Sequence, residues 1–392
     1  MKPSRPPSEA NAQSPETLVG LRTREPVRVA AGIPAIVQTM KHVMGQDGVV
    51  KGTRLLLKVN QANGFDCPGC AWPDPDGHRS IVEFCENGAK TVAEEGTAER
   101  VTPEFFREHS VAELSEQSDY GLGKRGRLTH PMVLREGATR YEPIEWDAAF
   151  ALIARELNAL ESPDEAVFYT SGRTSNEAAF LYQLFVRQFG TNNLPDCSNM
   201  CHESSGSALG PTIGIGKGTV KLDDFEKAEV IVVIGQNPGT NHPRMLTSLQ
   251  HAVRNGAKIV AINPLHETGL LAFKHPQELL HLLGKGTQLA SLFLQVRING
   301  DVPLLQGVAK ELLEMRAIDR DFVDADTAGF AEYEANLEKV NWDDIVEESR
   351  ISRDQIVAGL TGQENVIAAP AGDIVEGTLV KVVPTAVATQ GK

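Results

Sequence analysis

Two short apolar runs stand out in the hydrophobic pattern of this chain, at Val230–Ile234 and Lys258–Ile262. Runs of this length that are apolar almost throughout are typical of parallel strands buried on both faces. Between them, Pro243 stands where a first helical position is favoured, and Gly256 suits a helix end. A strand, a helix and a strand at this spacing predict a right-handed crossover in a parallel sheet.

Helix and strand also alternate in the sequence before this unit. Apolar residues recur at helical spacing over residues 146–160, residues 166–169 form a strand-like run, and a capping-box pattern opens a predicted helix over residues 174–190. The pattern predicts an α/β fold class, a multidomain chain with parallel-sheet, dinucleotide-type domains and a small loop-rich module. The other predicted elements are a strand over residues 53–60 and helices over residues 287–316 and 331–348.

Changes in composition divide the chain into five predicted segments. The lead is rich in Pro, Ser and charge, the next segment carries three cysteines, and the last has no aromatic residue and little helical period. The predicted segments are a disordered or irregular lead (1–44), a cysteine-bearing module (45–130), a first α/β domain that is incomplete (131–200), a second α/β dinucleotide-type domain (201–356) and an atypical tail (357–392).

The charge of the chain excludes some classes of partner. It has 392 residues, a formal net charge of −14 and a pI near 5.3. Nucleic acid and anionic membranes require a cationic footprint, so neither is an expected partner. The longest apolar runs are far shorter than a membrane span, and the N-terminal residues lack the apolar core of an export signal. A cytoplasmic protein without a membrane span is therefore expected.

Three of the five cysteines lie in the loop-rich module. The turn in Cys67-Pro68-Gly69-Cys70 points two thiols the same way, and Cys85 follows. The spacing leaves three alternatives open: an iron–sulfur cluster, a tetrahedral zinc site that adds His78, and unligated thiols. So few cysteines in a chain of this length favour metal or redox use over a disulfide framework.

Another thiol stands beside an imidazole at Cys201-His202, among small and polar residues. A thiolate is a good ligand for a soft metal, and an adjacent histidine can move a proton as electrons leave. The alternatives are a buried cysteine that acts as a small apolar residue and a hydrolase Cys-His pair. The loop over residues 235–243 follows a predicted buried strand, where it either binds nucleotide phosphates or only connects two elements.

Together these segments resemble the alpha subunit of the formate-dehydrogenase-like molybdopterin oxidoreductases, in the subgroup associated with acid resistance. The resemblance implies a two-electron redox reaction of a small-molecule substrate, with electrons passed via pterin to an iron–sulfur cluster and on to an electron-transfer partner protein. The stretches that carry it occur in the family's order at residues 66–74, 126–132, 171–177, 190–193, 201–202, 237–238 and 242–243.

The resemblance also implies cofactors and site residues. The cofactors are bis-molybdopterin guanine dinucleotide with molybdenum or tungsten, and a [4Fe–4S] cluster. Cys201 matches the cysteine that ligates the metal, and His202 matches the neighbouring histidine that takes the substrate proton. Lys90 matches a lysine between cluster and pterin. The matches to cluster ligands are Cys67, Cys70 and Cys85, and the matches to motifs lining the pterin nucleotides are Arg173, Asn237, Thr240, His242 and Asn263.

The sequence departs from the family pattern in three places. The third cysteine of the usual cluster motif is missing, and Asp74 stands near its place as a speculative oxygen ligand. Asn263-Pro264-Leu265 replaces an Asp-Pro-Arg that is common in relatives. Family members are much longer, so a C-terminally truncated chain is expected. The alternative functions are a zinc-stabilised, non-catalytic binding module and an inactive truncated fragment.

Overall fold

A computed structural model describes residues 27–70, 72–77, 79–170, 173–195, 197–216 and 218–359. Most of the predicted irregular lead, up to residue 26, and the predicted tail from residue 360 lie outside these ranges. Within them, helices and short strands alternate along the chain, and no helix is long and apolar enough to cross a membrane.

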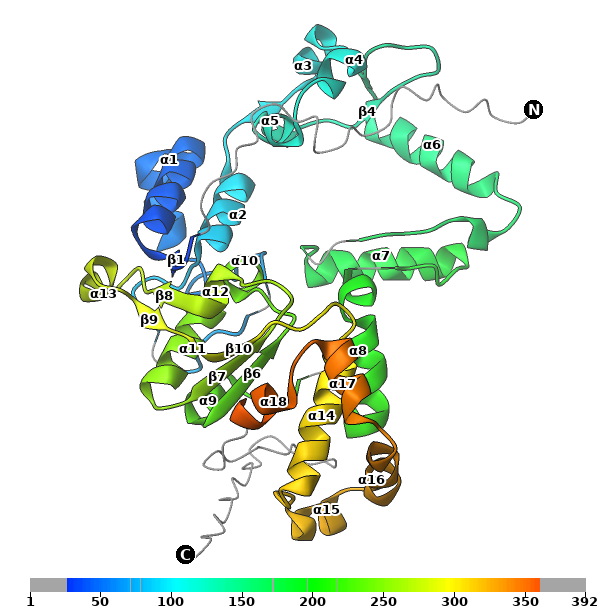
Figure 1. The fold of residues 1–392 in the computed structure, drawn as a ribbon. Helices are drawn as coiled ribbons and strands as arrows, with labels where there is room; N and C mark the ends of the chain where they lie inside the picture. The colour runs from blue at the N-terminus through cyan, green and yellow to red at the C-terminus, as the bar shows by residue number, and fades with distance from the viewer. Residues whose placement is uncertain are drawn as a thin grey trace, which may run out of the picture.

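The secondary structure is mostly helical, with short strands (Figure 1). The helices are α1 Gly32–Leu56, α2 Glu86–Gly96, α3 Pro103–Glu108, α4 Val111–Ser115, α5 Asp119–Gly123, α6 Trp146–Asn158, η3 Pro163–Glu165, α7 Asn176–Phe189, α8 Cys197–Ile213, α9 Leu222–Lys227, α10 Pro238–Asn241, α11 Met245–Arg254, α12 Thr268–Leu271, α13 Leu279–Leu283, α14 Asp301–Glu314, α15 Arg320–Asp326, α16 Phe330–Glu338, α17 Trp342–Ser349 and α18 Arg353–Gly359. The strands are β1 Ala30–Ala31, β2 Arg100–Val101, β3 Arg127–Leu128, β4 Met132–Val133, β5 Glu142–Pro143, β6 Val230–Ile234, β7 Lys258–Ile262, β8 Ala272–Lys274, β9 Thr287–Gln288 and β10 Ala290–Leu294.

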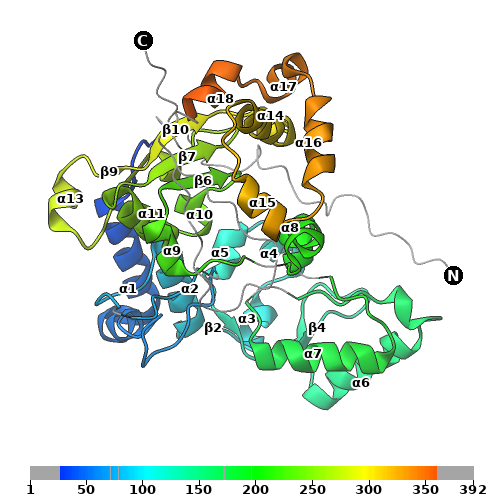
Figure 2. The same ribbon diagram turned by 90° about the horizontal axis from the view of Figure 1, so that it is seen from below.

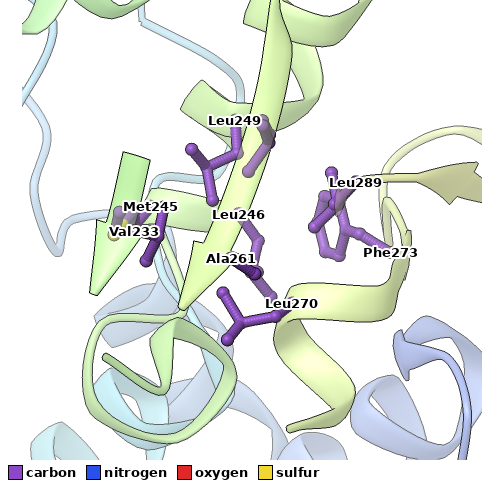
Figure 3. Packing of buried hydrophobic residues seen from close by; sticks show 9 residues of the cluster. Val233, Met245, Leu246, Leu249, Ala261, Leu270, Phe273 and Leu289 are labelled. Carbon is purple, nitrogen blue, oxygen red and sulfur yellow. The ribbon is translucent and has the colours of Figure 1, made fainter. Parts of the chain in front are cut away.

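A parallel three-stranded sheet in the order β10-β7-β6 organises the best-packed part of the structure. Both predicted apolar strands are confirmed, and Val230 pairs with Lys258 while Ile234 pairs with Ile262. Leucines of α11 pack on one face of the sheet, as Figure 3 shows for Leu246 and Leu249. Residues of α14, α17 and α18 pack on the other face. Strands β7 and β10 are thus covered on two sides, but Val232 and Ile234 of the edge strand β6 are 51% and 40% exposed, so the prediction that this run is buried on both faces is wrong for β6.

Two short helices stand at the carboxyl ends of these strands. Helix α10 follows β6, and α12 follows β7 by a few residues. They meet through glycines, because a Cβ atom on Gly269 would lie only 2.5 Å from the backbone nitrogen of Gly239. The side chain of Asn237 accepts a hydrogen bond from the N–H of Thr240 and donates one to Glu267 Oε2 at 2.8 Å. A hydrogen bond between residues at the N-caps therefore fixes α10 against α12.

The N-terminal part of the described chain, which carries the three cysteines Cys67, Cys70 and Cys85, packs against this unit. Helix α1 packs on α2 through Val43, Leu56, Ala89 and Ala93 (Figure 1). Strand β1 extends this contact, because it pairs in parallel with β8.

Four sequence predictions of local structure are wrong. Residues 53–56 end helix α1 and are not a strand, and the chain is already helical from Gly32, inside the segment expected to be irregular. Residues 287–294 form β9 and β10, so only α14 is helical within the predicted helix 287–316. Residues 166–169 are not a strand, although Phe168 donates one backbone hydrogen bond to Asn193. Tertiary contacts explain two of these differences. Helix α1 is buried against α2, and the strand β10 within residues 287–294 pairs with β7.

Helices α6 and α7 confirm two helical predictions and lie away from the parallel sheet in both views (Figures 1 and 2). The side chain of Ser175 caps α7 by accepting from the N–H of Ala178, as the capping pattern predicts. Val186 packs against Phe168 in a small separate core. The region that contains α6 and α7 is therefore stabilised by its own apolar contacts more than by contacts with the parallel sheet.

We expect Gly269→Ala to destabilise the protein by about 1–3 kcal/mol, because the new methyl group would force α12 away from α10. Urea unfolding followed by circular dichroism measures the change. Gly45→Ala in α1 is the matched control, since no atom lies within 4 Å of its Cβ position. That control should be neutral or stabilising by up to about 1 kcal/mol. Equal effects of the two substitutions would contradict the close approach of the helices.

Candidate metal and cofactor site

Three cysteines line one cavity of about 300 Å³ between the loop before α2 and the start of α11. Cys67 and Cys70 belong to that loop, and the backbone N–H of Cys67 donates to the buried Asn60 Oδ1 at 2.8 Å. Cys85 is the N-cap of α2, and its sulfur accepts a hydrogen bond from the N–H of Gly88 at 3.3 Å. The fold thus brings together the three cysteines that were predicted as cluster ligands.

A glycine keeps the space beside these sulfurs open. A Cβ atom on Gly88 would lie 2.9 Å from Cys67 Sγ and 3.6 Å from Cys85 Sγ. Both sulfurs therefore point toward the same side of α2, where any larger residue would fill the cavity. This position has no side chain, so its role in the site could not be read from a pattern of ligand residues.

Burial favours the protonated form of two of the three thiols. Burial raises the pKa of Cys67 and of Cys85, and the nearby sulfur of Cys70 raises both further. Backbone N–H groups of Gly69 and Gly88 oppose these effects by lowering the pKa. A cation that replaces the protons would relieve both the burial of charge and the repulsion between thiolates.

The arrangement of the thiols bears on two kinds of metal centre. Within the residues that the structure describes, no three His, Cys, Asp or Glu side chains are arranged to hold one metal ion. A cluster with several irons binds each thiolate to a different iron, so its ligands stand farther apart around a larger space. His78, the remaining member of the alternative zinc set, lies outside the described residues.

Asp74 also lines the cavity, where its carboxylate forms ion pairs although its buried Oδ1 accepts no hydrogen bond among the described residues. Its Oδ1 lies 2.6 Å from Arg244 Nη1, and its Oδ2 lies 3.3 Å from Arg79 Nη1. Arg244 also pairs with Glu83 Oε2 at 3.1 Å, and only 13% of its side chain is exposed. We call Arg244, Asp74 and Glu83 the arginine clamp. Arg244 immediately precedes α11, so the clamp ties the cysteine loop to the sheet.

A second polar link joins the thiol cavity to the strand ends. The side-chain amide of Asn87, two residues after Cys85, donates to the backbone oxygen of Thr240 at 2.6 Å. Thr240 was predicted as a nucleotide contact and lies on α10, directly after β6. The structure therefore places the start of α2 beside the loop that follows a parallel strand, where α/β sheets bind nucleotides.

Lys90 and Arg173 both lie on the α2 side of the site. Lys90 forms an ion pair with Glu86 one helical turn away. Arg173 Nη2 donates to Thr91 Oγ1 at 3.5 Å, next to Lys90. The charge of Arg173 reaches Cys67, since it lowers the pKa of that thiol against the larger effect of burial. Two cations that were predicted from separate motifs thus lie near the cysteine cavity.

The predicted nucleotide contacts at the strand ends also have internal partners. His242 Nδ1 lies 2.8 Å from Gln236 Nε2, and the ring of His242 lies near that of Trp72. Asn263 is buried and donates to the backbone oxygen of Leu265 at 3.0 Å. These side chains shape the loops after β6 and β7. Their predicted contacts with a pterin nucleotide remain predictions.

Cys201 and His202 lie in the first turns of α8. The imidazole of His202 is exposed, while the side chain of Cys201 is not among those the structure describes. Burial lowers the pKa of His242, and the charge of His202 lowers it further. This coupling brings the Cys201-His202 segment within electrostatic reach of the loop after β6.

Several residues of the region were not predicted. Asn60, Asn87, Gly88 and Arg244 hold or surround the thiols through contacts that are distant in sequence. Arg244 follows His242-Pro243 directly, and this position next to a recognised motif is the one signal that could have drawn attention to it.

Comparison with known families gives the site a context. Residues 127–296 match the family described as molybdopterin oxidoreductase. An uncharacterised oxidoreductase of Mycobacterium tuberculosis is 55% identical over 335 residues, which are 84% of this chain and 43% of that protein. Protein YdeP of Escherichia coli is 45% identical over 338 residues, which are 83% of this chain and 44% of YdeP. The chain thus spans less than half the length of these curated relatives.

Two more distant similarities were found. Formate dehydrogenase H of Escherichia coli is 28% identical over 236 residues, which are 59% of this chain and 30% of that enzyme. Among solved structures, acetylene hydratase from Pelobacter acetylenicus covers 58% of this chain and 29% of its own, with a TM-score of 0.47 and 18% identity. The sequence relatives confirm the resemblance that was drawn from the short motifs.

We expect Arg244→Met to lower the free energy of unfolding by roughly 1–3 kcal/mol, because it leaves the largely buried Glu83 without its cation and Asp74 with Arg79 alone. Urea unfolding of the metal-free protein measures this. Arg107→Met is the control, since Arg107 pairs with Glu104 at the surface with 61% of its side chain exposed. It should change the free energy by less than about 1 kcal/mol. A loss at Arg244 no larger than at Arg107 would mean that the clamp is not formed.

The raised thiol pKa values predict a pH dependence. In metal-free protein, Cys67 and Cys85 stay protonated in the fold at a pH where unfolded thiols, with a pKa of about 8.5, have ionised. Unfolding then releases protons, so this contribution to stability is present below that pH and is lost as the pH rises. The free energy of unfolding should fall more steeply between about pH 8 and pH 10 in wild type than in the C67A/C85A double variant. Parallel curves would contradict the shifts.

Proposed function

We propose that this chain, whose residues 127–296 match the molybdopterin oxidoreductase family, forms the cluster-bearing part of a molybdenum- or tungsten-dependent oxidoreductase of the formate dehydrogenase type. Its reaction is a two-electron oxidation or reduction of a small molecule such as formate. The proposal takes bis-molybdopterin guanine dinucleotide and a [4Fe–4S] cluster as the cofactors. The compartment proposed for it is the cytoplasm.

The observation that carries the proposal is the position of the thiol cavity. Cys67, Cys70 and Cys85 line a space whose wall includes Asn241 and Pro243, from the loop after β6. Asn87 fixes that wall by its hydrogen bond to Thr240. A cluster in the cavity would therefore stand beside a dinucleotide held at the strand ends, which is the arrangement that electron transfer between the two requires.

Each predicted residue has a task that its position supports. The bound molybdenum would supply a site that changes oxidation state by two electrons, and we assign its protein ligand to Cys201. We assign to His202 the acceptance of the substrate proton, since its imidazole is exposed and follows Cys201 directly. Arg173 adds positive charge near Cys67, and Lys90 lies on α2 beside Thr91, which accepts from Arg173, so both residues favour an anionic group on this side of the site.

The loops after β6 and β7 would bind the dinucleotide. We assign contacts with it to Asn237, Thr240, His242 and Asn263, which occupy the carboxyl ends of two parallel strands. Their internal hydrogen bonds keep the loops in one shape before a ligand arrives, and this lowers the ordering cost of binding. An electron-transfer partner protein would take the electrons from the cluster.

The proposal predicts that molybdenum or tungsten can be lost while iron stays bound. Cys201→Ser should lower molybdenum or tungsten content at least about tenfold while iron stays bound, because a serine hydroxyl is a poorer ligand for a soft metal. Elemental analysis of the purified protein gives both contents. Cys197→Ser, one turn earlier on α8, is the matched control and should leave both unchanged. Equal molybdenum in wild type and Cys201→Ser would remove the main support for this ligand.

A further inference from the structure

A second cavity, of about 360 Å³, lies between α1, α11 and the loop before α2. It shares Cys85 and Arg244 with the wall of the thiol cavity but does not reach Cys67 or Cys70. We call it the apolar cavity, because most of its wall is apolar, including Ile36, Met40, Trp72, Phe84, Leu246 and Phe273. A space of this size between apolar and aromatic side chains is typical of a binding site for a small organic molecule.

Three links between its walls give the apolar cavity a fixed shape. Ala30, just before α1, pairs with Phe273 of β8, and Phe273 is anchored in the apolar core of Figure 3. The side chain of Gln277 donates a hydrogen bond to the backbone oxygen of Val82 at 3.0 Å. The arginine clamp ties the same loop to the start of α11. The walls are therefore in place before a ligand arrives, and this lowers the ordering cost of binding.

Two hydroxyl groups in this wall lack a partner in the protein. Thr39 of α1 and Ser248 of α11 line the cavity and are only 5% and 8% exposed. Neither hydroxyl forms a hydrogen bond with another residue in the part of the chain that the structure describes. A buried hydroxyl without a partner is costly, and a ligand with a polar group would remove that cost. Water could serve the hydroxyls, but it would not replace the contacts that the apolar wall lacks.

The charged groups of the wall restrict the ligand to an uncharged molecule. Arg244 already pairs with Glu83 at 3.1 Å, and Glu86 already pairs with Lys90. None of these charges is left to balance an ionised ligand, and a charge buried without a counter-charge is strongly unfavourable.

We propose that the apolar cavity binds one small, uncharged aromatic molecule that carries a hydroxyl or carbonyl group. The aromatic side chains Trp72 and Phe273 would contact its ring, and the hydroxyls of Thr39 and Ser248 would bind its polar group. This site goes beyond the proposed function and does not depend on it, because no metal or cofactor takes part in forming the cavity. It gives the fold a second binding site that shares a wall with the thiol cavity.

The experiment uses the whole chain as purified and three related probes at pH 7: 2-naphthol, naphthalene and the ionised 2-naphthoate. Equilibrium dialysis measures the bound amount of each. We expect 2-naphthol to bind saturably at one site and 2-naphthoate to bind at least about tenfold more weakly, because its charge would be buried unpaired. Thr39→Val and Ser248→Ala should each weaken 2-naphthol binding about twofold to tenfold. Both variants should bind naphthalene as wild type does, since it has no polar group.

A further pair of variants locates the bound probe. Ala35 lines the cavity from α1, so Ala35→Phe should place a ring in the cavity and weaken 2-naphthol binding at least about tenfold. Gln38→Phe is the matched control, because Gln38 is exposed on the same helix and does not line the cavity. It should bind 2-naphthol as wild type does. Circular dichroism establishes that each variant folds, and Thr39→Val carries the test if Ala35→Phe does not.

Three results would overturn this inference. The first is the absence of saturable 2-naphthol binding to wild type. The second is equal binding by wild type and folded Ala35→Phe, or by wild type and both hydroxyl variants, because the probe would then lie elsewhere on the protein. The third is binding of 2-naphthoate as tight as that of 2-naphthol. None of these measurements involves a metal, so the proposed function stands or fails separately, through the metal content of Cys201→Ser.

Discussion

The ion pairs of Arg244 with Asp74 and Glu83 are the interaction on which the rest of the site depends. They join the cysteine loop to the residue that immediately precedes α11, and α11 in turn packs on the parallel sheet. Burying these charges is costly unless each one is paired, so the clamp has one arrangement that satisfies all of them. The backbone oxygen of Trp72 accepts a further bond from Arg244 at 3.4 Å. The position of the thiol cavity relative to the strand ends is fixed by this requirement.

The strand ends are held just as tightly by small residues. Gly239 and Gly269 let α10 and α12 approach until their backbones touch, and the hydrogen bond between Asn237 and Glu267 locks the approach. Asn87 then joins α10 to α2. A contact between Asn237 and a nucleotide has to coexist with its bond to Glu267 or replace it. The side chain is therefore as much a part of the loop's shape as a direct ligand.

The strands and motifs that could be predicted from the sequence are those whose structure is determined by residues close together in the chain. Val230–Ile234 and Lys258–Ile262 are short apolar runs that can be read directly as strands, although only Lys258–Ile262 is covered on both faces of the sheet. The CxxC spacing of Cys67 and Cys70 is local in the same way. Helix α1 was mistaken for a strand at its end because its burial comes from α2, not from its own sequence. Arg244 and Glu83 stand 161 positions apart, and nothing near either residue indicates the other.

Burial and neighbouring sulfurs together favour the neutral form of two thiols of the cavity, because they raise the pKa of Cys67 and of Cys85. The arginine clamp positions the loop that joins Cys70 to Cys85 through ion pairs that belong to the protein itself. A cation that took the place of the thiol protons would therefore meet side chains whose positions are set by other contacts. This lowers the ordering cost of binding such a cation.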